Sequence, residues 1–289
     1  MKKIIITGGA GFVGSRFKKM WEKEYIVLNP GSKELDVTDE AAVRELILGE
    51  KPDYVLHMAG IPNQQFCIEH PELAHAVNVD GSIYVAKACK EVGAKLVFIS
   101  TEQIFNGSEE PGPYTEESTP VPNTVYGENK LEVEKLLPEY IDECWILRFT
   151  WVFGLPERGC KMGANILWDT IDAVIKNKTI VTTEYEFRGM TDVKEICANL
   201  VKVFDLPYGT YHFGTRNDCG RYEIVKHIMT EMGVPEEVIA EKLVIDNSKF
   251  NADNRRELRL DNAKITELGI TFTPTKEAIT SCLKEFSMI

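Results

Sequence analysis

A tyrosine and a lysine four residues apart, Tyr126 and Lys130 in VYGENKLEVEKLL, have the types and spacing needed for proton transfer. Residues at i and i+4 share one face of a helix. The apolar residues of LEVEKLL recur at helical spacing after a loop that ends at Pro122-Asn123. A phenol with a pKa of about 10 relays protons poorly at neutral pH unless a cation lowers that pKa. We expect Lys130, always charged, to be that cation, although this spacing alone is more often a coincidence than a site.

A glycine-rich turn near the N-terminus gives this pair a context. Gly8, Gly11 and Gly14 form G-x-x-G-x-x-G in KKIIITGGAGFVG, between an expected strand and a helix that begins at Phe12-Val13. Glycines allow a tight turn and bring the backbone close to a pyrophosphate, which then lies at the positive end of the helix dipole. Directly after the first strand of an alternating chain, this spacing predicts a dinucleotide site.

Two further segments fit the same site. Leu35-Asp36-Val37 follows the second expected strand, where an acid can reach the adenine amino group. Met58-Ala59-Gly60 ends the third expected strand with small residues, as a backbone passing close to a ligand requires. These motifs predict eight cofactor-binding residues: Gly8, Gly11, Phe12, Val13, Asp36, Val37, Ala59 and Gly60.

The end of the second strand bears on the choice between NADPH and NADH. Dinucleotide folds often place an acid there for the adenosine ribose, whereas this chain has Asn29, followed by Ser32 and Lys33. The missing acid removes a reason to reject a 2′-phosphate, and Lys33 could bind one. The sequence therefore favours NADP over NAD, with the alternative that Lys33 is a solvated surface charge.

Strand-like and helix-like segments alternate along the first half of the chain. The strands read as continuous apolar runs, which is typical of parallel strands covered on both faces. The pattern predicts an α/β fold, a Rossmann-type doubly wound parallel sheet. Strands are expected at 3–7, 25–28, 54–57, 95–100 and 144–149, and helices at 12–22, 40–48, 72–91 and around Tyr126. The Pro-, Gly- and acid-rich stretch 104–125 is expected to be a surface loop near the site.

The alternation of strands and helices becomes less regular after Gly154. There we expect helices at 164–176 and 192–204, extended segments at 179–182 and 209–213, and short helices around 243–245. Residues 1–154 are predicted to form the dinucleotide-binding domain, completed by about 186–214. Residues 155–185 and 215–289 are predicted to form a smaller α/β substrate-binding lobe.

Composition excludes several other classes of protein. The net charge of −12 and the pI near 5.1 argue against a nucleic-acid partner. No apolar run approaches the roughly 20 residues of a membrane span, and Ile4-Ile5-Ile6 is too short for a signal peptide. The seven cysteines contain no C-x-x-C and the five histidines show no ligand spacing. We expect reduced thiols, no metal, and a cytoplasmic protein.

Together these motifs resemble the extended short-chain dehydrogenase/reductase family. The resemblance covers the glycine turn, ELDVTD at 34–39, Ala59-Gly60, AVNVDGS at 76–82 and the Tyr126–Lys130 pair. Within that family the chain is similar to the dTDP-4-dehydrorhamnose reductase branch of dTDP-rhamnose biosynthesis. The order that carries this similarity is STEQIF at 100–105, PYTE at 113–116, NTVYGENK at 123–130 and ILRFTWVFG at 146–154.

The resemblance implies an NAD(P)-dependent oxidoreductase that reduces a 4-keto nucleotide-sugar with NADPH or NADH, and it is compatible with a homodimer. It implies that Thr101 is the catalytic hydroxyl, Tyr126 the proton donor and Lys130 its partner. Asn78, Tyr126 and Lys130 would also contact the cofactor. Trp151 would be an aromatic wall for the sugar, and Arg188 in FRGMTDVKEI would reach the nucleotide-sugar phosphates, with a surface salt bridge as the alternative.

The chain departs from the family pattern on the presumed substrate face. Glu102 replaces the usual Asp, Gln103 replaces an aromatic residue, and Pro62-Asn63-Gln64 replaces a threonine- and acid-containing segment. We assign Glu102 and Gln103, with Trp151 and Arg188, to substrate binding. Because amides both donate and accept hydrogen bonds, these changes predict a sugar with a polar substituent that deoxy-sugars lack.

Two alternative functions remain open from the sequence. Some relatives, such as the regulatory subunit of methionine adenosyltransferase, imply a non-catalytic NAD(P)-binding regulatory subunit. A nucleotide-sugar epimerase or dehydratase of the same superfamily would retain NAD tightly, without net oxidation of the cofactor. For single residues, Arg148 is expected to be structural. Asn254, Arg255 and Arg256 are expected to form a solvated charge cluster, with contact to the nucleotide-sugar phosphates as the alternative.

Overall fold

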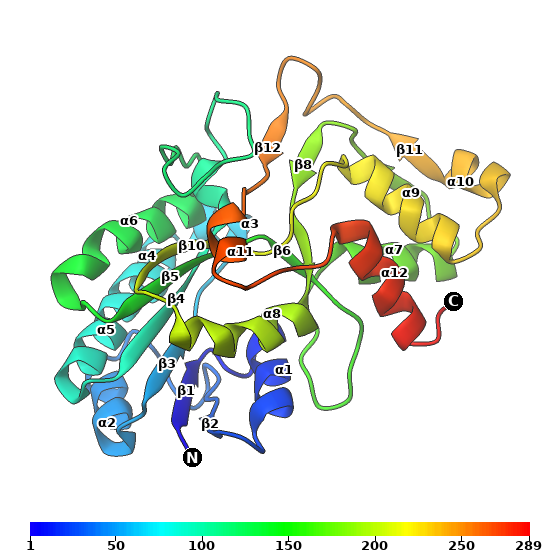
Figure 1. Cartoon of the computed structure of the whole chain (residues 1–289). Helices are drawn as coiled ribbons and strands as arrows, with labels where there is room; N and C mark the ends of the chain where they lie inside the picture. Colours follow the sequence, from blue (N-terminus) through cyan, green and yellow to red (C-terminus); the bar gives the residue numbers. More distant parts are fainter.

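A six-stranded parallel sheet forms the centre of the computed structural model, which describes residues 1–289 (Figure 1). The strand order is β10-β5-β4-β3-β1-β2, and every neighbouring pair is parallel. The predicted doubly wound parallel sheet is confirmed. The six strands are β1 (Lys3–Thr7), β2 (Ile26–Leu28), β3 (Tyr54–His57), β4 (Lys95–Thr101), β5 (Cys144–Phe149) and β10 (Gly209–Phe213).

Helices cover both faces of this sheet because successive strand residues point to opposite sides. On β1, Ile5 belongs to one hydrophobic core, whereas Ile4 and Ile6 belong to another. The first core is completed by α2 (Glu40–Glu50), α5 (Gly81–Val92) and α6 (Val125–Tyr140). The second is completed by α1 (Phe12–Trp21) and α8 (Val193–Leu200).

A third hydrophobic core lies beside the sheet and contains residues from 153 to 283 only. Its helices lie together at one side of the sheet in Figure 1: α7 (Ile166–Ile175), α9 (Arg221–Glu231), α10 (Glu236–Lys242) and α12 (Thr275–Glu285). The short helix α11 (Ala263–Glu267) instead packs against the sheet, since Ile265 belongs to the second core. The predicted domain boundaries stay a prediction.

Six strands of three residues form three parallel pairs outside the main sheet. They are β6 (Trp151–Phe153) with β9 (Met190–Asp192), β8 (Glu186–Arg188) with β12 (Arg256–Leu258), and β7 (Ile180–Thr182) with β11 (Leu243–Ile245). The sequence indicated extended structure at 179–182 but expected helices around 243–245. Runs such as EFR and REL give no signal, because three residues with charges among them show no apolar pattern.

The helix expected at 72–91 is broken into several pieces. This span contains α4 (Pro71–His75), a π-helical turn (Ala76–Asp80) and α5, and the short helix α3 (Gln64–Glu69) precedes it. Buried Asn78 lies within the π-turn, and such turns frequently occur at functional sites. Two 3₁₀ turns complete the chain, at Glu102–Phe105 and Val201–Asp205.

The structure has three further features that bear on class. No helix is both long and apolar enough to cross a membrane. No cluster of three His, Cys, Asp or Glu side chains has the geometry to hold a metal ion. All seven cysteines are free thiols.

Candidate active site

A cavity of about 460 Å³ lies between the glycine turn, the β2–α2 connection and the end of β3. Six of the predicted cofactor-binding residues line it: Gly8, Gly11, Asp36, Val37, Ala59 and Gly60. Phe12 and Val13 are not among the lining residues but form the first turn of α1. The motifs that the sequence placed in one site therefore meet around one cavity.

The glycine turn fits a dinucleotide pyrophosphate. Gly8 has a φ of +66°, and a Cβ there would lie 2.8 Å from the Cα of Ala59. The turn is closed by a hydrogen bond of 2.9 Å from the Gly11 N–H to the Gly8 carbonyl. No side chain caps α1, and its first turn contains no acid. Its first-turn amides are left without helical acceptors and can bind an anion.

Replacing Gly11 with valine is expected to weaken NAD(P)H binding at least tenfold while the fold is retained. The φ of Gly11 is an ordinary −73°, and a Cβ would approach only the Gly8 carbonyl, at 3.0 Å. A branched side chain would instead occupy the space for the pyrophosphate. Fluorescence titration with NADH and NADPH measures the loss, and the thermal midpoint reports the fold. Gly49→Val is the control, because a Cβ at Gly49 meets nothing within 4 Å. An unchanged titration would place the dinucleotide elsewhere.

Lys161 also lines the cavity, and sequence reasoning missed it. The segment that carries it is held over α1 by Arg16, whose guanidinium donates to the carbonyls of Leu155 at 2.9 Å and Lys161 at 2.8 Å. Arg16 also pairs with Glu157 at 3.1 Å. These contacts join residues about 140 positions apart, so no local pattern could reveal that a cation faces the cofactor cavity.

The Tyr126–Lys130 pair lies at the start of α6, as predicted. Thr124 caps this helix by accepting a hydrogen bond of 3.1 Å from the Gly127 N–H. A Cβ at Gly127 would lie 2.7 Å from the Gln103 carbonyl, so the first turn of α6 packs directly against the turn that follows Thr101. This close approach brings the helix carrying Tyr126 to the end of β4.

Lys130 connects α6, β4 and the cofactor cavity. Its ammonium donates a hydrogen bond of 2.9 Å to the Ile99 carbonyl, two residues before Thr101 on β4. A Cβ at Gly60 would lie 3.8 Å from the Lys130 Nζ and 3.2 Å from the Asn78 Oδ1. Asn78 also accepts a hydrogen bond of 2.7 Å from the Ile61 N–H. Lys130 and Asn78 therefore lie beside Gly60, at one end of the cavity, whereas the roles of Thr101 and Tyr126 there stay a prediction.

The predicted effect of Lys130 on Tyr126 is wrong. Burial raises the pKa of the Tyr126 phenol, and Cys67 and Glu102 raise that pKa further. Burial lowers the pKa of Lys130 to about 7, against the opposing effect of Glu134. Lys130 is thus not always charged, because desolvation of its ammonium outweighs the nearby carboxylate. The phenol of Tyr126 stays protonated at neutral pH, which suits a proton donor.

The expected structural role of Arg148 agrees with its contacts. Its guanidinium holds Glu134 with hydrogen bonds of 2.7 and 3.1 Å, and both side chains are buried. The Ser100 hydroxyl donates to the same carboxylate at 2.5 Å. Because Arg148 and Ser100 already bind the Glu134 carboxylate, that carboxylate stabilises the charged form of Lys130 only to a limited extent.

Three of the four predicted substrate-binding residues lie together. Arg188 forms an ion pair with Glu102, which is only 1% exposed, and stacks 4.6 Å from the centre of the Trp151 ring. Burial raises the pKa of Glu102 to about 7, although Arg188 opposes this shift. Glu102 Oε2 and Arg188 Nε are both buried without a hydrogen-bond partner. Arg188 is therefore in a buried ion pair, not in the surface salt bridge considered as the alternative.

Arg256 extends this group, so its expected place in a solvated charge cluster is wrong. It lies on β12 beside β8, where it pairs with Glu186 at 2.9 Å and donates to Asn106 at 2.9 Å. Glu186 also pairs with Arg221 at 2.9 Å and lies 3.7 Å from Arg188. The β8–β12 pairing leaves only 18% of the Arg256 side chain exposed, and runs as short as EFR and REL do not predict that pairing.

Gln103, the fourth predicted substrate-binding residue, accepts a hydrogen bond of 2.7 Å from the Gln64 amide. Two of the amides predicted on the sugar face therefore contact each other. Asn63 has a different role, since its side chain accepts from the Phe66 N–H at 2.8 Å and caps α3. The place of Asn63 on the predicted sugar face stays a prediction, because the cap uses only its oxygen and leaves both Nδ2 donors free.

Comparison with known protein sequences matches residues 1–288 to the family described as RmlD substrate binding domain. The chain is similar to the spore coat polysaccharide biosynthesis protein SpsK of Bacillus subtilis, with 26% identity over 99% of each chain. It is also similar to the methionine adenosyltransferase 2 subunit beta of Bos taurus, with 27% identity over 93% of this chain and 83% of that protein.

Solved structures show the same fold. A dTDP-4-dehydrorhamnose reductase from Clostridium acetobutylicum superimposes with a TM-score of 0.86 and 26% identity over 99% of each chain. A dTDP-4-dehydrorhamnose reductase from Bacillus anthracis, in complex with NADP, superimposes with a TM-score of 0.85 and 24% identity, again over 99% of each chain.

Proposed function

Because the chain belongs to the RmlD substrate binding domain family, we propose that it is an NAD(P)H-dependent reductase of a 4-keto nucleotide-sugar. The observation that carries the proposal is the meeting of Lys130 and Asn78 at the Gly60 end of the glycine-lined cavity, with Tyr126 on the same helix as Lys130. The names of the two similar solved structures support the same activity, and the NADP complex supports the cofactor.

In the proposed reaction, the cofactor would supply the hydride that reduces the carbonyl carbon, with NAD(P)⁺ as the oxidised product. The Tyr126 hydroxyl donates its proton to the carbonyl oxygen, so the ketone becomes an alcohol. The Thr101 hydroxyl donates a hydrogen bond to the same oxygen and stabilises the negative charge that develops there. Lys130 holds the nicotinamide ribose. The raised pKa of Tyr126 keeps its proton available at neutral pH.

The proposed substrate lies between this centre and the helices of the third core, which form the substrate-binding lobe. Trp151 packs against the sugar, and Arg188 with Glu102 borders it. The two unpartnered atoms of that pair, a donor and an acceptor, support a polar contact there. The Gln64–Gln103 pair supports a sugar that carries a polar substituent, which remains a prediction.

The decisive experiment measures NADH and NADPH oxidation with a panel of 4-keto nucleotide-sugars, including dTDP-4-dehydrorhamnose. Oxidation with formation of the 4-hydroxy sugar supports the proposed reductase. Conversion between sugars with no net oxidation would indicate an epimerase. Cofactor binding with no turnover of any sugar would indicate a regulatory subunit, an alternative that the similarity to methionine adenosyltransferase 2 subunit beta keeps relevant.

The activity of the reductase is expected to fall as the pH rises through about 7, because Lys130 loses its charge there. Its pKa is lowered by burial, so the charged form holds the ribose below pH 7 and is depleted above it. Lys130→Arg keeps a charge at every pH tested and should remove this decline in kcat/KM between pH 6 and 9, although the maximal rate is lower.

Glu102→Gln is the matched variant for the pH profile, because the pKa of Glu102 also lies at about 7. A decline that persists in Lys130→Arg and disappears in Glu102→Gln would assign the titration to Glu102 and contradict the role given to Lys130.

A further inference from the structure

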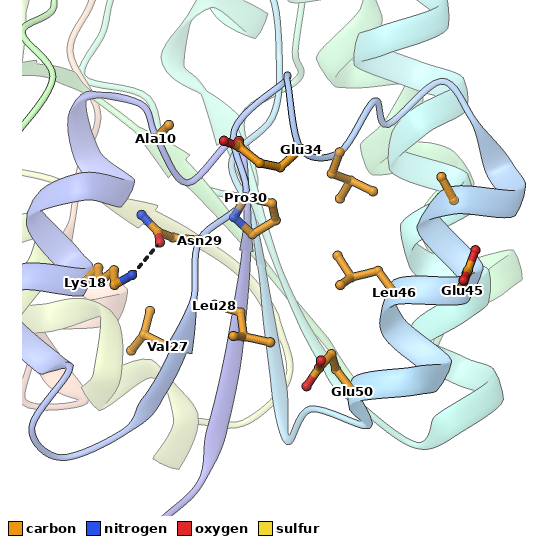
Figure 2. A pocket seen from close by; sticks show the side chains of 12 residues that line it. Ala10, Lys18, Val27, Leu28, Asn29, Pro30, Glu34, Glu45, Leu46 and Glu50 are labelled. Carbon is orange, nitrogen blue, oxygen red and sulfur yellow. Dashed lines mark hydrogen bonds between the residues drawn. The ribbon is translucent and has the colours of Figure 1, made fainter.

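A second cavity, of about 770 Å³, adjoins the cofactor cavity along the open edge of β2 (Figure 2). Ala10 and Leu35 line both cavities, so the two meet beside the glycine turn. Figure 2 shows Lys18 and Asn29 on one side of the second cavity, Leu46 and Glu50 on the other, and Glu34 at the top. In dinucleotide-binding folds the adenosine ribose lies beside the end of the second strand, which places it near this junction.

The position that usually carries the ribose-binding acid holds an amide in this chain and not a carboxylate. Asn29 occupies the end of β2, but its Oδ1 accepts a hydrogen bond of 3.0 Å from Lys18. Its Nδ2 donates to the Gly9 carbonyl at 3.3 Å. A Cβ at Gly9 would lie 2.5 Å from the Asn29 Cβ, so the strand end is packed tightly against the glycine turn. Asn29 thus holds the turn and the Lys18 ammonium in place.

The carboxylate of Glu34, five residues further along the chain, lies at this junction. The N–H groups of Glu34 and Leu35 both donate to the Gly31 carbonyl, at 3.0 and 2.9 Å, and this turn folds the chain back. The Glu34 carboxylate then accepts a hydrogen bond of 2.7 Å from the Gly31 N–H through Oε2. A Cβ at Gly31 would lie 2.8 Å from the Ala10 Cβ and 3.0 Å from that oxygen. Figure 2 shows the carboxylate directed toward Ala10.

We propose that Glu34 reads the adenosine ribose of the dinucleotide and discriminates against a 2′-phosphate. Oε2 is fixed by Gly31, and Oε1 is left to accept a hydrogen bond from a ribose hydroxyl. The same charge repels the phosphate of NADPH. This inference rests on the proposed dinucleotide cofactor. It gives Glu34 the ribose-binding role that an acid at the position of Asn29 usually has. It predicts a preference for NADH, opposite to the preference expected from Lys33.

Glu34→Gln tests the charge without breaking the turn, because the glutamine oxygen can still accept from the Gly31 N–H. Isothermal titration calorimetry gives the Kd of NADH and of NADPH with no sugar present. We expect the native chain to bind NADH more tightly. In Glu34→Gln, the ratio of the NADPH Kd to the NADH Kd should fall, mainly because NADPH binds more tightly once the negative charge is removed. We expect a fall of only about tenfold, since solvent and salt partly screen the repulsion between exposed charges. An unchanged ratio, or native preference for NADPH, would overturn the proposal.

Two comparison variants separate this effect from others. Lys161→Met removes a cation from the cofactor cavity. It should weaken the binding of NADH and the binding of NADPH by the same factor, because both molecules contain the diphosphate. Lys33→Met could selectively weaken NADPH binding while Glu34→Gln leaves the ratio of the two Kd values unchanged. In that case Lys33 sets the cofactor specificity and the proposal is wrong. Failure of both dinucleotides to bind the native chain would reject the proposed cofactor itself, a result distinct from an unchanged ratio.

Discussion

Replacing Tyr126 with phenylalanine is expected to reduce kcat by roughly 10²–10⁴-fold, the range that general acid catalysis supplies. The Kd of NADH and NADPH should change less than about twofold. Phenylalanine preserves the half-buried ring and its position on α6. The Tyr126 hydroxyl makes no hydrogen bond within the protein and is not fully buried. Its removal therefore takes away the proposed proton and little else.

Stopped-flow measurement of a single turnover, with cofactor already bound, isolates the chemical step from sugar release. Tyr140→Phe is the matched control, since it makes the same change at the far end of the same helix. Tyr140 lies against the Lys87 ammonium, 5.5 Å from its ring centre, and away from the cavity. Near-normal turnover in Tyr126→Phe would reject the proton route through this phenol.

The parts of the site that the sequence predicted are those held by local geometry. The glycines of the first turn lie within seven residues, and Tyr126 and Lys130 lie on consecutive turns of one helix. Buried parallel strands were also predictable, because their apolar runs have no polar face to interrupt them. In each case the spacing along the chain fixes the spacing in the fold.

The parts that the sequence did not predict depend on contacts between distant segments. Lys161 reaches the cofactor cavity through contacts with Arg16, and Glu102 meets Arg188 across 86 positions. The pKa of Lys130 belongs to the same class, because it depends on how much water the fold removes around the ammonium. A charge pattern in the sequence carries no information about that burial.

Replacing Arg188 with methionine is expected to lower the free energy of unfolding by about 3–5 kcal/mol at pH 8, since it leaves a buried carboxylate unpaired. Glu102 would lose its ion-pair partner, while Glu186 would keep Arg221 and Arg256. The loss should shrink as the pH falls from 8, because Arg188 lowers the pKa of Glu102 and its removal raises that pKa above about 7. The pKa of Glu102 is already raised above its ordinary value by burial, so its neutral form is favoured in the folded state and the unpaired charge disappears on protonation.

Urea denaturation of the native chain and the variant at pH 5.5 and pH 8 measures this difference. Lys226→Met is the control for loss of a cation, because its partner Glu236 is exposed and such pairs contribute at most about 1 kcal/mol. Adding Glu102→Gln to Arg188→Met should recover much of the stability at pH 8, since the uncompensated charge is then absent. An equal loss at both pH values, not recovered by Glu102→Gln, would show that Arg188 stabilises the fold through its packing against Trp151. The lower free energy of unfolding would then come from lost contact area and not from the charge of Glu102.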